Sequence, residues 1–351
     1  SNGVSWQMYH GYSRLYFEIS KENEYIHIPD WYYNVEYIRE KEAGLPSQED
    51  LFAPGFFDLD IKKGESIIVA AGLEEVKADG LKRSFAAEVK KRTPRNNYHN
   101  CLVNASEQFL VKTKNKTELM AGFPWFGTWG RDTFIALPGI TLSRGDEASF
   151  KNVLDTMIAT MKGPLFPNIG RDNKPDYAAV DAPLWFFWCL QEYAGYKNNK
   201  SEIWKKYRKP MLAILEGFRS GTEYNIHMDE NGLLYAGGTG MALTWMDVFN
   251  NGKPVTARSG YAVEVNALWY NAISFALELA SEAGDNAFIN EWENIPSQIK
   301  NTFNQLFVSS SHGYLADYVF DGYTDWTVRP NMLLAVALPY SAVDEEMQNS
   351  V

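Results

Sequence analysis

Residues 121–140, AGFPWFGTWGRDTFIALPGI, combine aromatic rings with an adjacent guanidinium and carboxylate. Trp125 and Trp129 offer flat faces that can stack on the C–H faces of sugar rings. The neighbouring Arg131 and Asp132 can direct hydrogen bonds onto two hydroxyl groups in fixed directions. An aspartate here can also cap the apolar helix that follows, so a Trp-rich turn with a helix cap is the alternative. The pattern indicates a carbohydrate site only if other segments repeat it.

Three later loops repeat this design, because each places polar and aromatic residues directly before an apolar helical run. They are NKPDYAAVDAPLW, which carries Asp181 and Trp185, KPVTARSGYAVEVN, which carries Glu264, and YTDWTVRPN, which carries Arg329 and Asn331. One acid at a helix start is usually a cap. Here four helix starts, the first of them with Asp132, each place a polar residue beside an aromatic one. Four starts of this kind favour convergence on one concave site if the helices run in the same direction.

The segment GGTGMALTWMD, residues 237–247, contains the candidate for acid catalysis. Asp247 follows Trp245 and lies outside any helical pattern. A carboxyl group beside an indole ring, where water is scarce, favours its protonated form, as the general acid for a glycosidic oxygen requires. A turn aspartate on a glycine-rich loop is the alternative. The segment lacks the GxxxxGK[ST] pattern, so we do not expect a phosphate loop.

Composition and charge argue against several classes of function. The formal net charge is −11, whereas nucleic-acid binding needs clustered basic residues, so we expect no nucleic-acid partner. Cys101 and Cys189 are far apart and the 5 histidines show no ligand spacing, so we expect no disulfide framework, no metal and no cofactor. No apolar run reaches the length of a membrane span, and SNGVSWQMYH at the start lacks a signal-peptide pattern. We therefore expect a cytoplasmic protein that does not contact membranes.

The elements that must position these residues change type along the chain. Residues 1–77 contain short segments that alternate apolar and polar residues, which predicts the C-terminal part of an antiparallel β-sandwich with too few strands to close. Residues 78–101 are rich in Lys and Arg and predict a solvated linker helix. In residues 102–351, amphipathic helices alternate with helices that are apolar nearly all round. Outer helices covering an inner ring predict a mainly α fold, an α/α toroid.

Long motifs of this chain resemble the glycogen-debranching amylo-α-1,6-glucosidase family. They occur in the order PWFGTWGRDTFIALPG, DAPLWF, TWMD, AVEVNALWYNA and RPNMLLAVALP, and residues 30–66 resemble the end of that family's N-terminal β-sandwich. The resemblance implies an (α/α)6 barrel and an inverting hydrolase. Such an enzyme removes the single α-1,6-linked glucose at a trimmed branch point, so its partner would be a branched α-glucan such as glycogen or limit dextrin.

The resemblance also assigns roles to single residues. Asp247 matches the general acid, and Arg131 and Asp132 match a pair that holds hydroxyl groups of the non-reducing glucose. The residues expected to line the sugar pocket are Trp125, Trp129, Asp181, Trp185, Trp245, Glu264, Arg329 and Asn331. The family's general base belongs to a GxxSE-type motif beyond the RPN helix, and the residues up to Val351 contain none. We therefore expect a fragment with an incomplete barrel, whose base lies beyond Val351.

Two other functions stay open at this point. Another α/α-barrel α-glucosidase, acting on trehalose or α-1,4 oligosaccharides, would use the same glucose pocket. A non-catalytic glycan-binding protein would keep the aromatic surface without needing a base. Branched and linear substrates distinguish the two enzymes, and the residues encoded after Val351 would reveal whether a base exists.

Overall fold

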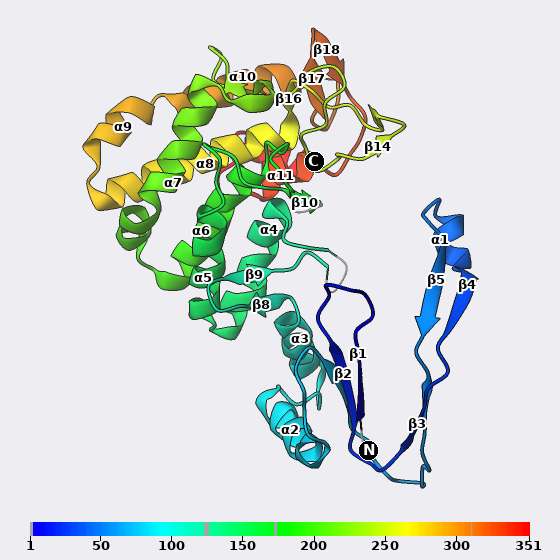
Figure 1. Cartoon of the computed structure of the whole chain (residues 1–351). Coiled ribbons are helices and arrows are strands. Elements are labelled where there is room, and N and C mark those ends of the chain that lie inside the picture. The colour runs from blue at the N-terminus through cyan, green and yellow to red at the C-terminus, as the bar shows by residue number, and fades with distance from the viewer. Residues whose placement is uncertain (1–2, 123–125, 172–173, 310) are drawn as a thin grey trace. The chain divides into compact units, whose positions relative to one another are not determined.

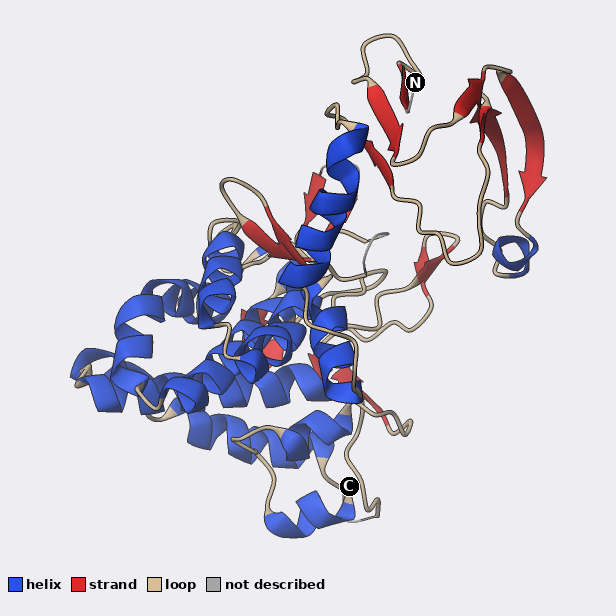
Figure 2. Ribbon diagram, turned by 90° about the horizontal axis from the view of Figure 1, so that it is seen from below, coloured by secondary structure: helices blue, strands red, loops and turns tan. Residues whose placement is uncertain are grey.

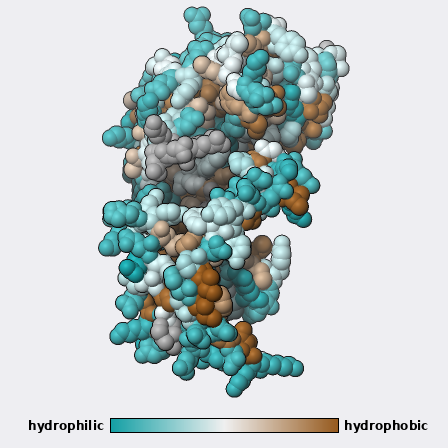
Figure 3. Space-filling view, turned by 45° about the vertical axis from the view of Figure 1, so that its right-hand side comes forward, coloured by the Kyte–Doolittle hydropathy of each residue, from teal (hydrophilic) through white to brown (hydrophobic). Residues whose placement is uncertain are grey.

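The computed structural model describes residues 3–122, 126–171, 174–309 and 311–351. The chain divides into two compact units, Ser1–Asn104 and Ala105–Val351 (Figure 1). No helix among the described residues is long and apolar enough to cross a membrane. The face seen in Figure 3 is mostly hydrophilic, and its apolar residues form separate patches.

The first unit is built from short antiparallel strand pairs. Its central sheet has the order β1 (Gly3–Trp6), β2 (Leu15–Ile19) and β7 (Val69–Gly72). Two further ribbons pair β3 (Glu24–Ile26) with β6 (Phe56–Asp58) and β4 (Asp30–Glu36) with β5 (Gln48–Ala53), and the short α1 (Ile38–Glu42) links the latter pair. Phe17 of β2 and Phe57 of β6 stack with ring centroids 5.2 Å apart, so aromatic contacts join the sheet to one ribbon.

A charged helix follows these strands, as the sequence predicts. Helix α2 (Ala78–Lys91) ends shortly before Pro94 and buries only Leu81, so it is solvated on nearly every side. Helix α3 (Tyr98–Glu107) then leads into the second unit.

The second unit alternates inner and outer helices. The inner helices are α4 (Gly130–Thr141), α6 (Ala182–Lys197), α8 (Val263–Ala283) and α11 (Met332–Ala337), and each contacts the next. The outer helices are α5 (Glu147–Ile158), α7 (Lys200–Ser220), α9 (Asn286–Trp292) and α10 (Ile295–Phe307). Helix α5 packs on α4, α7 packs on α6 and α8, and α9 and α10 pack on α8. Figure 2 shows these helices as the bulk of the unit.

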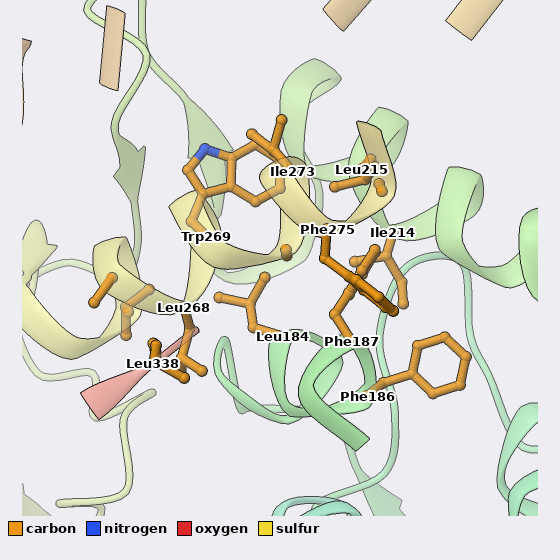
Figure 4. Close-up of a cluster of buried hydrophobic side chains, with 14 of the residues drawn as sticks. Leu184, Phe186, Phe187, Ile214, Leu215, Leu268, Trp269, Ile273, Phe275 and Leu338 are labelled. Atoms are coloured by element: carbon orange, nitrogen blue, oxygen red, sulfur yellow. The ribbon is translucent and has the colours of Figure 1, made fainter. Parts of the chain in front are cut away.

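One part of the core of this unit lies between α6, α7 and α8 (Figure 4). Leu184 and Phe187 of α6 and Leu268 of α8 are fully buried, because both inner helices are apolar nearly all round. Full burial of such a side chain contributes about 1.5–3 kcal/mol relative to exposure. The buried indole of Trp269 donates a hydrogen bond to the Gly232 carbonyl at 3.2 Å, which satisfies its polar atom within this core.

Short antiparallel hairpins occupy several connections between the helices. The pairs are β8 (Leu110–Lys112) with β9 (Thr117–Leu119), β10 (Ile169–Arg171) with β11 (Lys174–Asp176), β12 (His227–Met228) with β13 (Leu234–Tyr235), and β14 (Phe249–Asn250) with β15 (Lys253–Pro254). Strand β16 (Tyr261–Ala262), directly before α8, forms a three-stranded sheet with β17 (Tyr318–Phe320) and β18 (Tyr323–Asp325), which follow α10. The short α12 (Glu345–Ser350) comes last. This sheet brings residues near 317 beside the start of α8, although they are more than fifty positions apart.

Candidate active site

A pocket of about 330 Å³ lies where the four inner helices begin. It is lined by Arg131, Ile135, Asp181, Trp185, Trp245, Glu264, Pro330, Asn331 and Leu334. Arg131 lies in the first turn of α4, Asp181 precedes α6, Glu264 lies in the first turn of α8, and Asn331 precedes α11. The four motif loops that precede these helices therefore meet at one place.

Two of the polar side chains at these helix starts do not cap their own helices. Asp181 and Asn331 occupy N-cap positions, but neither side chain accepts a hydrogen bond from its helix. Helix α4 does not open on Asp132: it begins at Gly130 with Trp129 at the N-cap, and Asp132 lies in the first turn. Helix N-termini still favour nearby negative charge. The Asp181 carboxylate is thus free to bind a partner across the pocket.

Arg131 links two of the candidate carboxylates. Its Nε and Nη2 donate to the two oxygens of Asp181 at 2.6 and 2.8 Å, and its Nη1 donates to Oδ2 of Asp247 at 3.2 Å. Burial lowers the pKa of the guanidinium, but the two carboxylates outweigh this effect and raise the pKa above its ordinary value. The side chain of Asp181 is only 2% exposed and that of Asp247 is 25% exposed. Asp247 is therefore the member of this cluster that a ligand can reach.

Asp132 does not join this cluster of hydrogen bonds. Burial raises the pKa of its carboxyl group, Arg131 opposes the rise, and the nearby Asp181 and Asp247 add to it. Its side chain lines a separate hollow of about 340 Å³, which shares Arg131 and Ile135 with the first pocket.

A second buried arginine, Arg258, binds two other carboxylates near the start of α8. Arg258 donates through Nε to Oδ2 of Asp317 at 2.7 Å and through Nη2 to Oε2 of Glu264 at 2.6 Å, and all three side chains are 1% exposed. Burial lowers the pKa of Arg258, yet the carboxylates raise it overall. Burial also raises the pKa of Glu264, and Arg258 partly offsets the rise.

This buried cluster extends to the segment that carries Asp247. Asp317 accepts hydrogen bonds from Nη1 of Arg329 at 2.6 Å and from Nδ2 of Asn331 at 2.7 Å. The Asn331 carbonyl in turn accepts from the Trp245 indole at 2.7 Å. Arg258 also donates to the Thr244 hydroxyl at 3.3 Å. The TWMD segment is thus anchored on both the Thr244 and the Trp245 side chains.

Arg258 and Asp317 are not among the site residues predicted from the sequence. Arg258 lies six positions before Glu264 in the same motif loop, and an arginine beside a helix-start glutamate is the signal that could have identified it. Asp317 has no comparable signal, because the pairing of β16 with β17 brings it to the site.

A wider pocket of about 710 Å³ contains the carboxylate of Asp247 together with Trp129, Asn168, Asp176 and Tyr224. Since Arg131 lines the first pocket and contacts Asp247 in this one, its guanidinium forms part of the boundary between them.

The expectation of a single shared pocket is therefore corrected. Six of the expected residues line the first pocket: Arg131, Asp181, Trp185, Trp245, Glu264 and Asn331. Trp129 and Asp247 line the wider one, and Asp132 lines the third. Arg329 lines none of these three pockets and contacts the site through its hydrogen bond to Asp317. Trp125 lies outside the described residues.

Comparison with known proteins shows the family of this chain. Residues 104–351 match a family model described as amylo-alpha-1,6-glucosidase, and residues 1–68 match one described as glycogen debranching enzyme N terminal. The chain belongs to the amylo-alpha-1,6-glucosidase family. A similar protein is the glycogen debranching enzyme of Saccharomyces cerevisiae, 23% identical over 319 residues, which cover 65% of this chain and 21% of that enzyme. This family member thus spans about a fifth of its yeast relative.

Two solved structures share the fold. A GH78 family rhamnosidase of Bacillus sp. GL1 superposes with a TM-score of 0.55 at 13% identity, covering 99% of this chain and 38% of that one. A bacterial glucoamylase complexed with acarbose superposes with a TM-score of 0.55 at 14% identity, covering 96% of this chain and 55% of that one. Both are glycoside hydrolases of the α/α-toroid type, so the toroidal arrangement of inner and outer helices is the fold of this family member.

Proposed function

We propose that this chain is the glucosidase part of a debranching enzyme. It would hydrolyse the α-1,6 linkage of the single glucose left at a branch point, with glycogen or limit dextrin as its partner and the cytoplasm as its location. The proposed fold is an (α/α)6 toroid over residues 102–351, with a linker at 78–101 and part of a β-sandwich at 1–77. The observation that carries the proposal is the partly exposed Asp247, 3.2 Å from the arginine that also holds Asp181.

The first pocket suits a single glucose ring. Its volume of about 330 Å³ lies at the small end of ligand sites. Trp185 and Trp245 supply aromatic surfaces for the C–H faces of the sugar. Asp181 and Glu264 also line this pocket, where buried arginines hold their carboxylates in place. In this proposal Arg131 keeps Asp181 and Asp247 in position, because three of its five N–H donors already bind carboxylates.

In the proposed reaction Asp247 acts as the general acid. Its proton passes to the glycosidic oxygen as the bond to the anomeric carbon breaks, and the leaving glucan departs with a free hydroxyl group. A water molecule attacks the anomeric carbon from the opposite face and loses its proton to a second carboxylate about 6.5–9.5 Å from the first. The product is β-glucose. Since the 351 residues contain no GxxSE-type motif, the proposal assigns this base to no residue of the chain.

The decisive experiment offers the full-length gene product three substrates: a branched limit dextrin, a linear maltooligosaccharide and trehalose. We expect glucose from the branched substrate alone, and NMR of the first product should show the β-anomer. Preferential release from trehalose or the linear substrate would instead identify another α-glucosidase of this fold. Binding of dextrin without turnover would identify a glycan-binding protein.

A further inference from the structure

Tyr224, in the wider pocket, has an unusual backbone conformation. Its φ of 63° and ψ of 22° lie in the left-handed region, which a bulky side chain rarely adopts. The other non-glycine residues with positive φ in the described parts of the chain are all Asn or Asp, which tolerate it: Asn34, Asn198, Asn225, Asn251 and Asp321. Strained residues of this kind persist where the surrounding structure holds them, and they cluster at functional sites.

The segment that carries Asp247 holds Tyr224 in this conformation. The Gly237 amide donates to the Tyr224 carbonyl at 3.1 Å, and the Asn225 side chain donates to the Gly237 carbonyl at 3.0 Å. Gly237 has a φ of 83°, and a Cβ there would lie 3.2 Å from the Ser259 hydroxyl, so this close approach requires glycine. The strained turn and the candidate acid are thus joined through one loop, residues 237–247.

The surroundings of Tyr224 have the chemistry of a sugar site. The same 710 Å³ pocket contains the Trp129 and Phe249 rings and the carboxylates of Asp176 and Asp247. Phe249 is 49% exposed, so this aromatic surface is open to a ligand. Aromatic faces beside hydrogen-bond acceptors suit the apolar faces and hydroxyl groups of pyranose rings.

We propose that this wider pocket binds the glucan chain that leaves when the terminal glucose is cut off, and that Tyr224 is its specificity-determining residue. The inference rests on the proposed function. The small pocket would take the glucose, Asp247 would lie between the two sugars, and the strained turn would hold the tyrosine against the leaving chain. Discrimination between branched and linear substrates would then depend on the wider pocket, because the glucose ring is the same in both.

The test measures binding of maltotetraose, a linear α-1,4 glucan, by titration calorimetry in saturating glucose, which occupies the small pocket. Tyr224→Asn keeps a residue that tolerates the left-handed conformation but removes the ring. We expect its affinity to fall about tenfold, and that of Tyr224→Phe to stay within about twofold. Tyr235→Asn is the matched control: this half-buried tyrosine stacks on His227 and lines none of the three pockets described above, so its affinity should match wild type. Equal affinity of Tyr224→Asn and wild type, or an equal loss in Tyr235→Asn, would overturn the inference.

Hydrolysis gives a second readout. For Tyr224→Asn, kcat/KM should fall at least about fivefold more for a branched dextrin than for α-glucosyl fluoride, whose leaving group does not occupy the wider pocket. Equal losses on both substrates would contradict the assignment. Failure of the proposed function is distinguishable, because a protein that releases no glucose could still bind maltotetraose in a Tyr224-dependent way.

Discussion

Two buried arginines of the second unit each bind two carboxylates, but the two clusters differ in how far their carboxylates are exposed to solvent. Arg131 binds Asp181 and Asp247, and Arg258 binds Glu264 and Asp317. In the second cluster every side chain is 1% exposed, whereas in the first the Asp247 side chain is 25% exposed. A charge enclosed by partners stabilises geometry, and a charge with one open side can exchange a proton with a ligand. Exposure, and not the residue types, separates the candidate catalytic cluster from its support.

The largest expected effect follows from removing the open carboxylate. In the full-length gene product, Asp247→Asn cannot donate the proton to the leaving oxygen, so kcat on a branched dextrin should fall about 10²–10⁴-fold. A leaving group of low pKa needs little protonation, so α-glucosyl fluoride should partly restore the rate. Steady-state kinetics on both substrates provide the measurement. Wild-type turnover of dextrin by this variant would exclude Asp247 as the acid.

Breaking the closed cluster should chiefly affect stability. Arg258→Met leaves Glu264 and Asp317 as buried carboxylates without their main partner, which should lower the free energy of unfolding by about 3–5 kcal/mol. Urea unfolding followed by circular dichroism would measure the loss. The control is Lys91→Met, which breaks an exposed pair with Glu88, and its loss of stability should be much smaller than that of Arg258→Met. Equal losses in the two variants would show that enclosure does not distinguish the clusters.

Arg131→Lys tests the bridge between both pockets while keeping its charge. Lysine cannot reproduce the two parallel hydrogen bonds to Asp181 and still reach Asp247. We expect kcat/KM to fall about 10–100-fold, from poorer positioning of both carboxylates. Unlike Asp247→Asn, this variant should stay impaired on α-glucosyl fluoride, because its defect is not in proton donation. A full rescue by the fluoride would place Arg131 in the proton transfer itself.

A partly exposed cluster around Glu147, without an arginine, is expected to show the smallest effect. Hydrogen bonds from Lys151 and Tyr193 lower the pKa of Glu147 to about 2. Because the folded-state pKa is depressed, the stabilisation is complete above the ordinary value near 4.5 and disappears as the pH falls toward 2. Glu147→Gln should therefore lower stability at pH 7 by at most about 1 kcal/mol, since solvent screens this surface group, and by less at pH 3. Urea midpoints at both pH values test this, and a larger difference at pH 3 would contradict it.

Much of the architecture and the location of the candidate site could be predicted from local sequence. Runs such as APLWFFWCL have no polar face, and they form buried inner helices, while the amphipathic segments between them form the outer layer. The motif loops lie before those helices and meet at one pocket. The β-sandwich stays a prediction, because the strands of the first unit form only small separate sheets. The count of six helical hairpins also stays a prediction.

The partners within the site could not be predicted, because they depend on long-range contacts. Arg131 and Asp247 are 116 positions apart, and Arg258 and Asp317 are 59 apart. The sequence by itself determined the helical period, the family motifs and the polar residue types at each helix start, since these are properties of neighbouring residues. Only the tertiary structure decided that Asp181 binds an arginine instead of capping α6 and that Asp132 faces a different hollow. It also decided that, of the four carboxylates in the two arginine clusters, Asp247 is the one with an open side. The physical reason is that hydrogen-bond partners and access to water depend on how distant segments pack, and no local pattern records this.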